Sequence, residues 1–285
     1  MKARLILNLA LLGLLIAIGL AAFFWPEPQA EPQIRLSSLT RNEVNQVRVE
    51  RRGNPAIELE KLGEGDWRMR APYNSRADRY QMDRLIDLVS ATAKQQLPRA
   101  NLQRYQLDPA EVRVTLNGEV FEFGATNELT NEQYVAKDDA IYLVATFHGY
   151  NVPMEAAKIL SHRLLAESEV PVAFDFGAWQ IERDERGDWT VAGKPPVKDP
   201  EMSQDDLQQW LAEWRHAGGL TAEPYRGPRA RARLAVSLSD GRSVVFDILS
   251  RRPEVRLVRT DENILYQFTE DSGSRLLDPY RVSRP

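Results

Sequence analysis

The chain has 285 residues, of which 43% are hydrophobic and 27% charged, so its composition is that of a folded protein rather than a disordered one. Its formal net charge of −4 offers no basic field to nucleic acid, which we do not expect as a partner. The sequence has no cysteine, which excludes disulfides, thiolate metal sites and cysteine nucleophiles, and only three histidines. We therefore expect no cofactor and no metal, and most familiar catalytic routes are closed.

A long apolar run lies near the amino terminus. Residues 5–25 contain one polar residue, Asn8, and they follow Lys2 and Arg4. A helix of this length, at about 1.5 Å per residue, is about 32 Å long and can cross the hydrocarbon core of a bilayer. Because the positive charges precede the run, the amino terminus is predicted to stay in the cytoplasm. The sequence predicts a single-pass signal anchor over residues 1–25 in the inner membrane, with the remainder in the periplasm or outside.

A cleaved signal peptide is the alternative for this run. Such a peptide has an apolar region of roughly 7–15 residues followed by a small-x-small cleavage site. The run here is longer, and Ala30 is a poor cleavage position because Pro28 lies two residues before it. These features favour the uncleaved anchor. The following residues, 26–35, are rich in proline and predict a semi-extended linker.

The sequence repeats itself internally. Gly65-Asp66-Trp67 recurs as Gly187-Asp188-Trp189, at an offset of 122 residues. Other landmarks recur in the same order: 47–51 with 179–183, 82–88 with 202–210, 112–116 with 234–238, and 134–144 with 255–266. The period is far longer than a solenoid unit, so we predict two tandem copies of one domain.

Each copy has the same predicted order of elements. A strand pair is followed by the strand that begins at Gly-Asp-Trp, then by a helix, a hairpin with an Asn-Gly or Asp-Gly turn, and a last hairpin. In the second copy, Ser203 and Asp206 form a predicted capping box at the start of the helix. Apolar residues recur at helical spacing in both copies: Met82, Leu85, Ile86, Val89 and Ala93, then Leu207, Trp210, Leu211 and Trp214. The fold class predicted is α+β, with each copy an antiparallel sheet that carries one main helix.

The predicted organisation has six parts. They are a signal anchor (1–25), a Pro-rich linker (26–35), a first repeat (36–150), a connecting helix (151–168, with its helical pattern over 154–165), a second repeat (169–279) and a short polar tail (280–285).

Several short motifs resemble those of a known family. Besides Gly65-Asp66-Trp67, they are Ala71-Pro72-Tyr73, Ala77-Asp78-Arg79, Tyr105-x-Leu107-x-Pro109, Phe123-Gly124 and Tyr142-Leu143-Val144. With the amino-terminal anchor, they make the chain similar to the bacterial domain-of-unknown-function family 4340 over residues 36–280. The resemblance implies an anchored envelope protein without an assigned activity, found in some cases beside the ATPase, permease and auxiliary subunit of a gliding-motility-type ABC exporter. It implies no active-site residues.

Aromatic, histidine and carboxylate residues are further candidates for a functional site. Trp67 and Trp189 can form a platform for a glycan or peptide, but a duplicated core also duplicates its tryptophans, and we favour the core. The three histidines show no metal-ligand spacing. Carboxylates cluster where turns and helix starts are expected, at 138–139, 199–206 and 270–271, which makes a hydrolase with paired carboxylates a minor alternative.

Arginines in the second copy are the strongest candidates for a partner site. If the segment before Leu234 is a strand, its alternation with alanine places three guanidinium groups on one face. Such a face can bind an acidic partner, a lipid head group or a cell-wall polymer. The alternative is a solvated face paired with nearby acids such as Asp240 and Asp247. The candidate partner-binding residues are Arg229, Arg231, Arg233 and Arg256.

Together these observations predict a non-enzymatic, membrane-anchored accessory or scaffolding protein outside the cytoplasm. The membrane assembly implied by the resemblance is an ABC-type export system, with its permease or auxiliary subunit as partner. The alternative is a module that binds a glycan, peptide or lipid of the envelope in a cleft between the two repeats.

Overall fold

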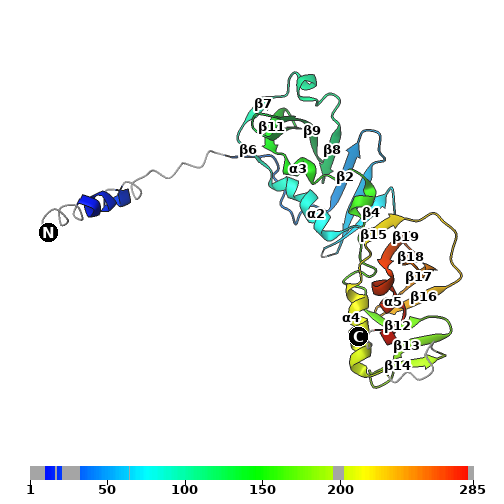
Figure 1. Cartoon of the computed structure of the whole chain (residues 1–285). Helices are drawn as coiled ribbons and strands as arrows, with labels where there is room; N and C mark the ends of the chain where they lie inside the picture. Colours follow the sequence, from blue (N-terminus) through cyan, green and yellow to red (C-terminus); the bar gives the residue numbers. More distant parts are fainter. Residues whose placement is uncertain (1–9, 17, 21–32, 64, 195–201, 282–285) are drawn as a thin grey trace, which may run out of the picture. The chain divides into compact units, whose positions relative to one another are not determined.

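The computed structural model describes residues 10–16, 18–20, 33–63, 65–194 and 202–281 (Figure 1). The chain divides into two compact units, 1–34 and 35–285. In the first unit, residues 10–16 and 18–20 are helical, and most of the predicted anchor and linker lies outside the described residues. No helix among the described residues has both the length and the apolar character needed to cross a membrane.

The first large sheet is antiparallel and has nine strands, in the order β5-β4-β3-β2-β8-β9-β10-β11-β7. Apolar residues alternate along its strands, as in Val47, Val49, Ile57 and Leu59, which are all buried. The strands are β2 (Gln46–Arg51), β3 (Ile57–Leu62), β4 (Asp66–Ala71), β5 (Ser75–Arg76), β7 (Gln96–Pro98), β8 (Val112–Leu116), β9 (Glu119–Asn127), β10 (Glu132–Lys137) and β11 (Ala140–Ala145). A separate two-stranded sheet joins β1 (Ile34–Arg35) and β6 (Thr92–Ala93).

The second large sheet has eight strands, in the order β14-β13-β12-β16-β17-β18-β19-β15. It is also antiparallel throughout. The strands are β12 (Pro171–Asp175), β13 (Trp179–Arg183), β14 (Trp189–Gly193), β15 (Thr221–Pro224), β16 (Arg233–Leu238), β17 (Ser243–Ser250), β18 (Glu254–Arg259) and β19 (Ile264–Thr269). Antiparallel sheets with few helices confirm the α+β class.

Within residues 35–285, the described helices are short and few. They are α2 (Arg79–Ile86), α3 (Phe147–Tyr150), α4 (Gln204–His216) and α5 (Glu270–Leu277), with 3-10 turns η1 (Asp87–Ser90), η2 (Leu102–Tyr105), η3 (Ala156–Ile159) and η4 (Pro279–Arg281). The predicted capping box of α4 is confirmed, because the Ser203 side chain accepts from the Asp206 backbone while the Asp206 side chain accepts from the Ser203 backbone. In the first sheet, the predicted helix ends earlier than expected, at Ile86, and continues only as η1.

The two large sheets share one strand order. Reading outward from β4 and from β14, strands β4-β3-β2-β8-β9-β10-β11-β7 correspond one by one to β14-β13-β12-β16-β17-β18-β19-β15. Trp67 lies near the start of β4, and Trp189 begins the corresponding strand β14. This order matches β13 with β3, so the predicted equivalence of 47–51 with 179–183 is wrong by one strand. The alternating apolar patterns of neighbouring strands are alike, which explains the error.

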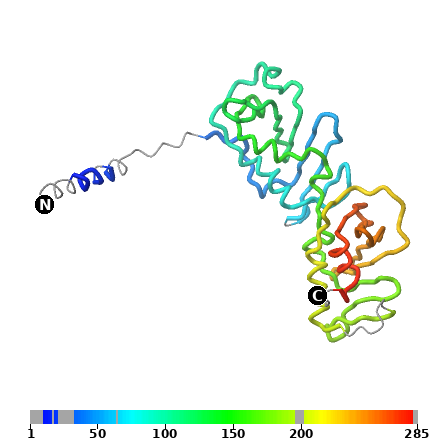
Figure 2. The backbone as a smooth tube through the Cα atoms, in the orientation of Figure 1, coloured from blue at the N-terminus to red at the C-terminus, as the bar shows by residue number. Residues whose placement is uncertain are grey.

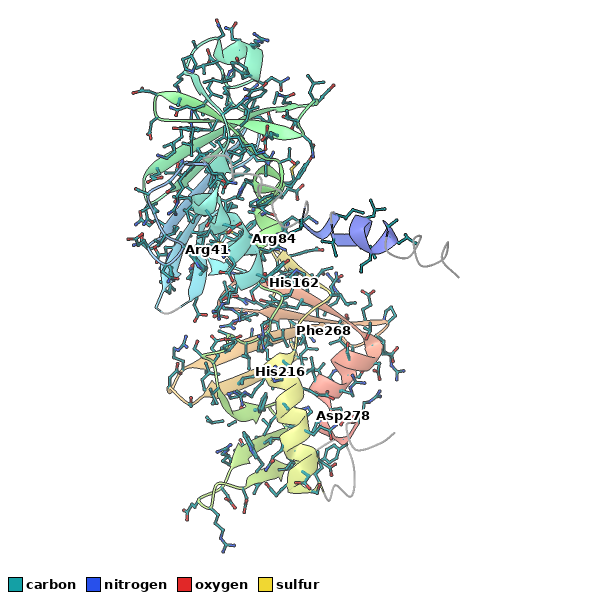
Figure 3. All side chains as sticks on the ribbon, turned by 90° about the vertical axis from the view of Figure 1, so that its left-hand side faces the viewer. Arg41, Arg84, His162, His216, Phe268 and Asp278 are labelled. Carbon is teal, nitrogen blue, oxygen red and sulfur yellow. The ribbon has the colours of Figure 1, made fainter. Side chains whose placement is uncertain are left out.

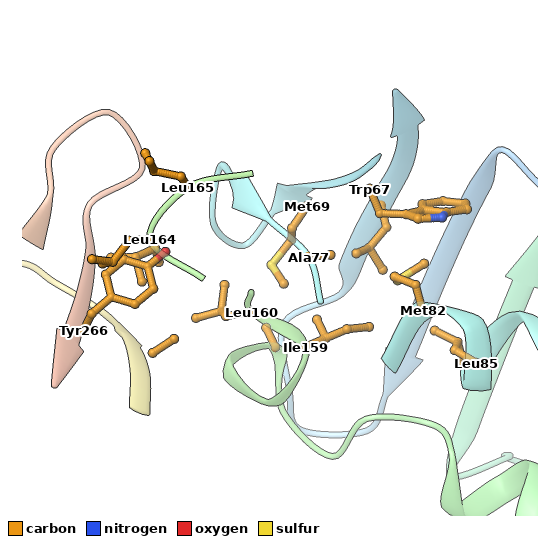
Figure 4. Packing of buried hydrophobic residues seen from close by; sticks show 14 of the residues in the cluster. Trp67, Met69, Ala77, Met82, Leu85, Ile159, Leu160, Leu164, Leu165 and Tyr266 are labelled. Atoms are coloured by element: carbon orange, nitrogen blue, oxygen red, sulfur yellow. The ribbon is translucent and has the colours of Figure 1, made fainter. Parts of the chain in front are cut away.

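The core is built around these sheets and their helices. Trp67, near Met82 and Leu85 of α2, is buried and only 5% exposed (Figure 4). In the second sheet, the ring of Phe174 lies 4.6 Å from that of Trp210, and Trp214 lies 5.7 Å from Phe246. The prediction that the duplicated tryptophans are core residues is therefore confirmed for Trp67, and also for Trp189, which is 4% exposed.

The predicted connecting helix over 151–168 is wrong. Only η3 is helical there, and the chain that follows η3 consists of bends and a turn with isolated bridges (Figure 2). Leu160 pairs with Ala77 of the first sheet region, and Arg163 pairs with Gly218 beside the second. The backbone groups of the connection thus bond to both halves of the unit, which replaces the hydrogen bonds that a helix would make within itself.

The predicted polar tail (280–285) is wrong at its start, because Tyr280 is buried in η4. Residues after 269 form α5 and η4, in which Leu276, Leu277 and Tyr280 are buried. Trp210 and Trp214 of α4 donate indole hydrogen bonds to the carbonyls of Arg275 and Leu276, at 3.0 and 2.9 Å. Helix α5 and the turn η4 therefore close the second core, and residues 282–285 lie outside the described part.

Candidate functional site

The arginines singled out in the sequence do not lie on one strand face. Strand β16 begins at Arg233, so Arg229 and Arg231 belong to the connection between β15 and β16. The expectation of three guanidinium groups on one strand is wrong. The backbone of this connection bonds instead to a side chain, because the Ala230 N–H donates to the Asp247 carboxylate at 3.2 Å.

Asp247 gathers two of these arginines. Its side chain is fully buried, at 0% exposed, and accepts from Arg233 Nε at 3.0 Å. Arg229 Nη1 lies 3.7 Å from the other carboxylate oxygen. Pairing with a nearby acid is thus confirmed for Asp247. Asp240, the other predicted acid, accepts from Arg242 at 2.7 Å instead.

The remaining candidates lie close by but are not equivalent. Arg231 is exposed, and so is Arg226 before it. Arg256 of β18 is opposite Ser250 on β17, and Asp247 of β17 is opposite Val258 on β18. Since directly opposed residues share a face, Arg256 and Asp247 lie on the same side of the sheet. The Nε of Arg256 is buried and has no hydrogen-bond partner among the described residues.

A second group of charges, which is not among the candidate site residues predicted from the sequence, lies where the two sheets meet. Arg259 of β18 is buried and binds Glu169 with both terminal nitrogens, at 2.7 and 2.6 Å. Arg259 Nη1 also donates to the Leu164 carbonyl at 2.9 Å, and its Nε to Asp261 at 3.0 Å. The guanidinium therefore holds the connection, at Leu164 and Glu169, against the second sheet.

Arg76 reaches into this group from the first sheet. Its Nε donates to Glu262 Oε1 at 2.9 Å, and its Nη2 to the Tyr266 hydroxyl at 3.1 Å. The same Nη2 lies 2.8 Å from the Arg163 carbonyl and 3.1 Å from that of Leu164. Apolar packing continues beside it, with Ala77, Leu160, Leu164 and Tyr266 close together (Figure 4).

We call Arg76, Glu169, Arg259, Glu262 and Tyr266 the junction cluster. Burial opposes ionisation of Glu169, but hydrogen bonds and attraction from Arg259 prevail and lower its pKa to about 2. Burial raises the pKa of Tyr266 to about 12. Arg259 loses some basicity to burial and regains more from Glu169 and Asp261, so its pKa is raised. Glu169 and Arg259 therefore stay charged at neutral pH, which suits a clamp rather than proton transfer.

One signal in the sequence indicates this cluster. On β18, Val255 and Leu257 face the core, and Arg259 is the next residue on that same face. A charged residue at a core position of a period-two pattern requires a buried partner. The pattern does not reveal that the partner is Glu169, which lies ninety residues earlier in the chain.

A surface pocket adjoins the junction cluster. Its volume is about 340 Å³, and its lining includes Trp67, Arg76, Tyr80, Ser161 and Glu167. Trp67 contributes little surface to it because that side chain belongs to the core.

The histidines are dispersed. His148 lies on α3, His162 in the connection and His216 at the end of α4, and Figure 3 labels the last two. His162 Nδ1 lies 3.1 Å from the Gly219 carbonyl, a contact between the connection and the second sheet region. Across the described residues, no three or more His, Cys, Asp or Glu side chains are grouped to hold a metal ion.

The fold and the junction cluster define a protein of two antiparallel sheets joined by buried ion pairs. The family model described as Domain of unknown function (DUF4340) matches residues 67–211, about half of the chain. The chain belongs to this family. The match begins in β4 of the first sheet and ends in α4 on the second, so it includes the whole connection and Glu169. No curated protein and no solved structure matches the chain.

Proposed function

We propose that this chain is a non-enzymatic accessory protein, held in the cytoplasmic membrane by its amino-terminal helix, that serves as a scaffold in an ABC-type export assembly. The observation that carries the proposal is the helical stretch of residues 10–16 and 18–20. All of these residues are exposed, and its large side chains are Leu or Ile, with Leu15 64% exposed. A helix that is apolar on every side needs lipid or protein around it.

The length of the apolar run supports insertion into lipid. The helical stretch is the middle of the apolar run 5–25, whose ends lie outside the described residues. Lys2 and Arg4 precede the run, which favours export of residues 36–285 by the positive-inside rule. The export-assembly part of the proposal rests on the family resemblance.

The scaffold role is supported by the way the two sheets are joined. The junction cluster links them through buried, charge-assisted hydrogen bonds, which favour one fixed arrangement of the surfaces that partners would contact. The shared strand order of the two sheets supports the proposal that they are tandem repeats. Each repeat would then present its own version of one surface.

The membrane tether is tested by charge substitution within the run. In Leu12→Arg/Leu15→Arg, each arginine costs about 3 kcal/mol at the centre of a bilayer. We expect the parent chain to stay in the membrane after carbonate extraction, and the variant to be released. Leu129→Arg is the matched control, since Leu129 is 96% exposed in the β9–β10 turn and should not alter retention. Release of the parent chain would disprove the tether.

The assembly is tested by crosslinking in intact membranes, followed by affinity recovery and mass spectrometry. Recovery of an ABC permease or its auxiliary subunit in a stoichiometric amount is the expected result. Recovery of the chain alone, from membranes in which the export system is present, would contradict the scaffold role.

The pocket beside the junction cluster favours a second candidate, a binding site for a soluble envelope ligand. Its combination of exposed Tyr80 with polar Ser161 and Arg79 suits a glycan or a short peptide. Titration with soluble peptidoglycan fragments, followed by calorimetry, should give saturable heat that Tyr80→Ala abolishes. No heat from the parent chain would remove this candidate.

A further inference from the structure

We propose that residues 225–233, here named the arginine segment, are the docking surface for an acidic segment of a partner protein. The inference deepens the proposed function, on which it rests, by naming the chemistry of the partner. The segment contains four arginines and no carboxylate in nine residues: Arg226, Arg229, Arg231 and Arg233.

The segment is held against the second sheet by its own contacts. Its start is fixed where the Tyr225 N–H donates to the Asn263 carbonyl at 2.7 Å. Its middle is fixed where the Ala230 N–H donates to buried Asp247. Its end is fixed where the Ala232 carbonyl accepts from the Ile248 N–H at 2.9 Å. A surface ordered before binding loses less conformational entropy when a partner docks.

Two of the four guanidinium groups remain available to a partner. Arg229 and Arg233 share the single carboxylate of Asp247, although both side chains stay at least half exposed. Arg226 and Arg231 are exposed, and neither is paired with any residue that the structure describes. The segment therefore carries more positive charge than Asp247 can balance.

The positive charge of the arginine segment favours an anionic partner, and the use of arginine without lysine favours a protein. The guanidinium fork matches a carboxylate with two parallel hydrogen bonds, and arginine is enriched at protein interfaces while lysine is depleted. All four cations of the segment are arginine.

A lipid surface fits less well. Segments that bind membranes combine cations with large apolar side chains that enter the bilayer. Here the residues between the arginines are Gly227, Pro228, Ala230 and Ala232, which offer no such anchor.

The test measures binding of fluorescent poly-L-glutamate, about 20 residues long, to the full chain in detergent. Arg226→Ser/Arg231→Ser removes the two unpaired guanidinium groups and leaves Arg229 and Arg233, the ion-pair partners of Asp247, in place. We expect binding about tenfold weaker than that of the parent chain, and weaker binding by both proteins as salt is added. Arg104→Ser/Arg186→Ser is the control, since it removes the same charge from exposed residues elsewhere. It should bind like the parent, and equal thermal midpoints for the three proteins show that all are folded.

Three results would overturn the proposal. The first is that the parent chain does not bind poly-L-glutamate. The second is that both double variants bind poly-L-glutamate equally weakly. The third is that the parent chain binds phosphatidylglycerol vesicles more tightly than poly-L-glutamate and that only Arg226→Ser/Arg231→Ser loses this binding, which would assign the segment to lipid. The crosslinking experiment separates these failures from failure of the scaffold role. If the permease is recovered while poly-L-glutamate does not bind, only the docking proposal fails. If the reverse holds, the scaffold role fails.

Discussion

The ion pair between Arg259 and Glu169 is the most deeply buried charge interaction of the junction cluster. Its two side chains are only 2% and 4% exposed, so the charges are removed from water and depend on each other. Burying such a pair adds little net stability, but removing Glu169 leaves buried Arg259 with the partly exposed carboxylate of Asp261 as its direct ion-pair partner.

Substitution Glu169→Gln tests this dependence. It keeps the shape of the side chain and one acceptor, but it leaves Arg259 charged and buried. We expect the free energy of unfolding to fall by about 3 kcal/mol in urea titration. Glu167→Gln is the control, because Glu167 is 67% exposed and its ion pair with Arg163 is on the surface. A loss below that of the control would show that the pair is not coupled to stability.

The same carboxylate predicts a dependence of stability on pH. The pKa of Glu169 is lowered from 4.5 to about 2 in the folded chain, so folding favours its ionised form. This contribution is complete above pH 4.5, and it is lost as the pH falls towards 2. Its size is about 3 kcal/mol, from about 1.4 kcal/mol per pKa unit. The free energy of unfolding, measured by urea titration, should therefore change less between pH 6 and pH 3 for Glu169→Gln than for the parent chain. An equal change in both proteins would contradict the assignment.

At the scale of helices and strands, predictions from short sequence motifs are correct where the motif forms hydrogen bonds within a few residues of the chain. Asn117-Gly118 was predicted as a hairpin turn, and the structure has positive φ at both residues, 46° and 93°, between β8 and β9. Helix α4 was predicted from its capping box for the same reason. The prediction of a helix in the connection (151–168) failed because its apolar spacing is compatible with a helix. Its backbone instead pairs with Ala77 and Gly218, which are distant in sequence.

Substitution Ser203→Ala tests the start of α4. It removes the acceptor for the Asp206 N–H, at 3.1 Å, and the hydroxyl that donates to the Asp206 carboxylate at 2.7 Å, while the backbone N–H of residue 203 keeps its bond to that carboxylate. We expect a loss of about 1 kcal/mol in the free energy of unfolding, measured by circular dichroism in urea. Ser203→Asp should recover most of it, because aspartate is an equally good N-cap. Gln209→Ala, at an exposed position of the same helix, should be close to neutral.

For residues 35–285 as a whole, Arg76 of β5 is the side chain that links the first sheet to the second by hydrogen bonds. It contacts Glu262, Tyr266 and two carbonyls of the connection, and these groups have few other partners. The two sheets are expected to unfold together as long as this link is intact.

Substitution Arg76→Ala tests that coupling. We expect hydrogen exchange to show both sheets of the parent chain losing protection at one urea concentration, and at two different concentrations in the variant. The physical reason is that buried Glu262 loses its hydrogen-bonded partner and keeps only Arg68, at 4.0 Å, which weakens the junction by roughly 3 kcal/mol. Arg79→Ala, 68% exposed and next to the same pocket, is the control. Coincident loss of protection in Arg76→Ala would show that apolar packing alone couples the sheets.

The sequence by itself determined the features that depend on residues close together in the chain. These are the antiparallel strands from period-two patterns, the turns from Asn-Gly and Asp-Gly, the cap of α4 and membership of the family. Only the tertiary structure decided the path of residues 151–168, the burial of α5 and η4, and the meeting of Arg76 with Glu262 across the sheets. The physical reason is that buried backbone and charged groups must be satisfied by whichever partners the packed fold supplies, and those partners lie at sequence distances that no local pattern encodes.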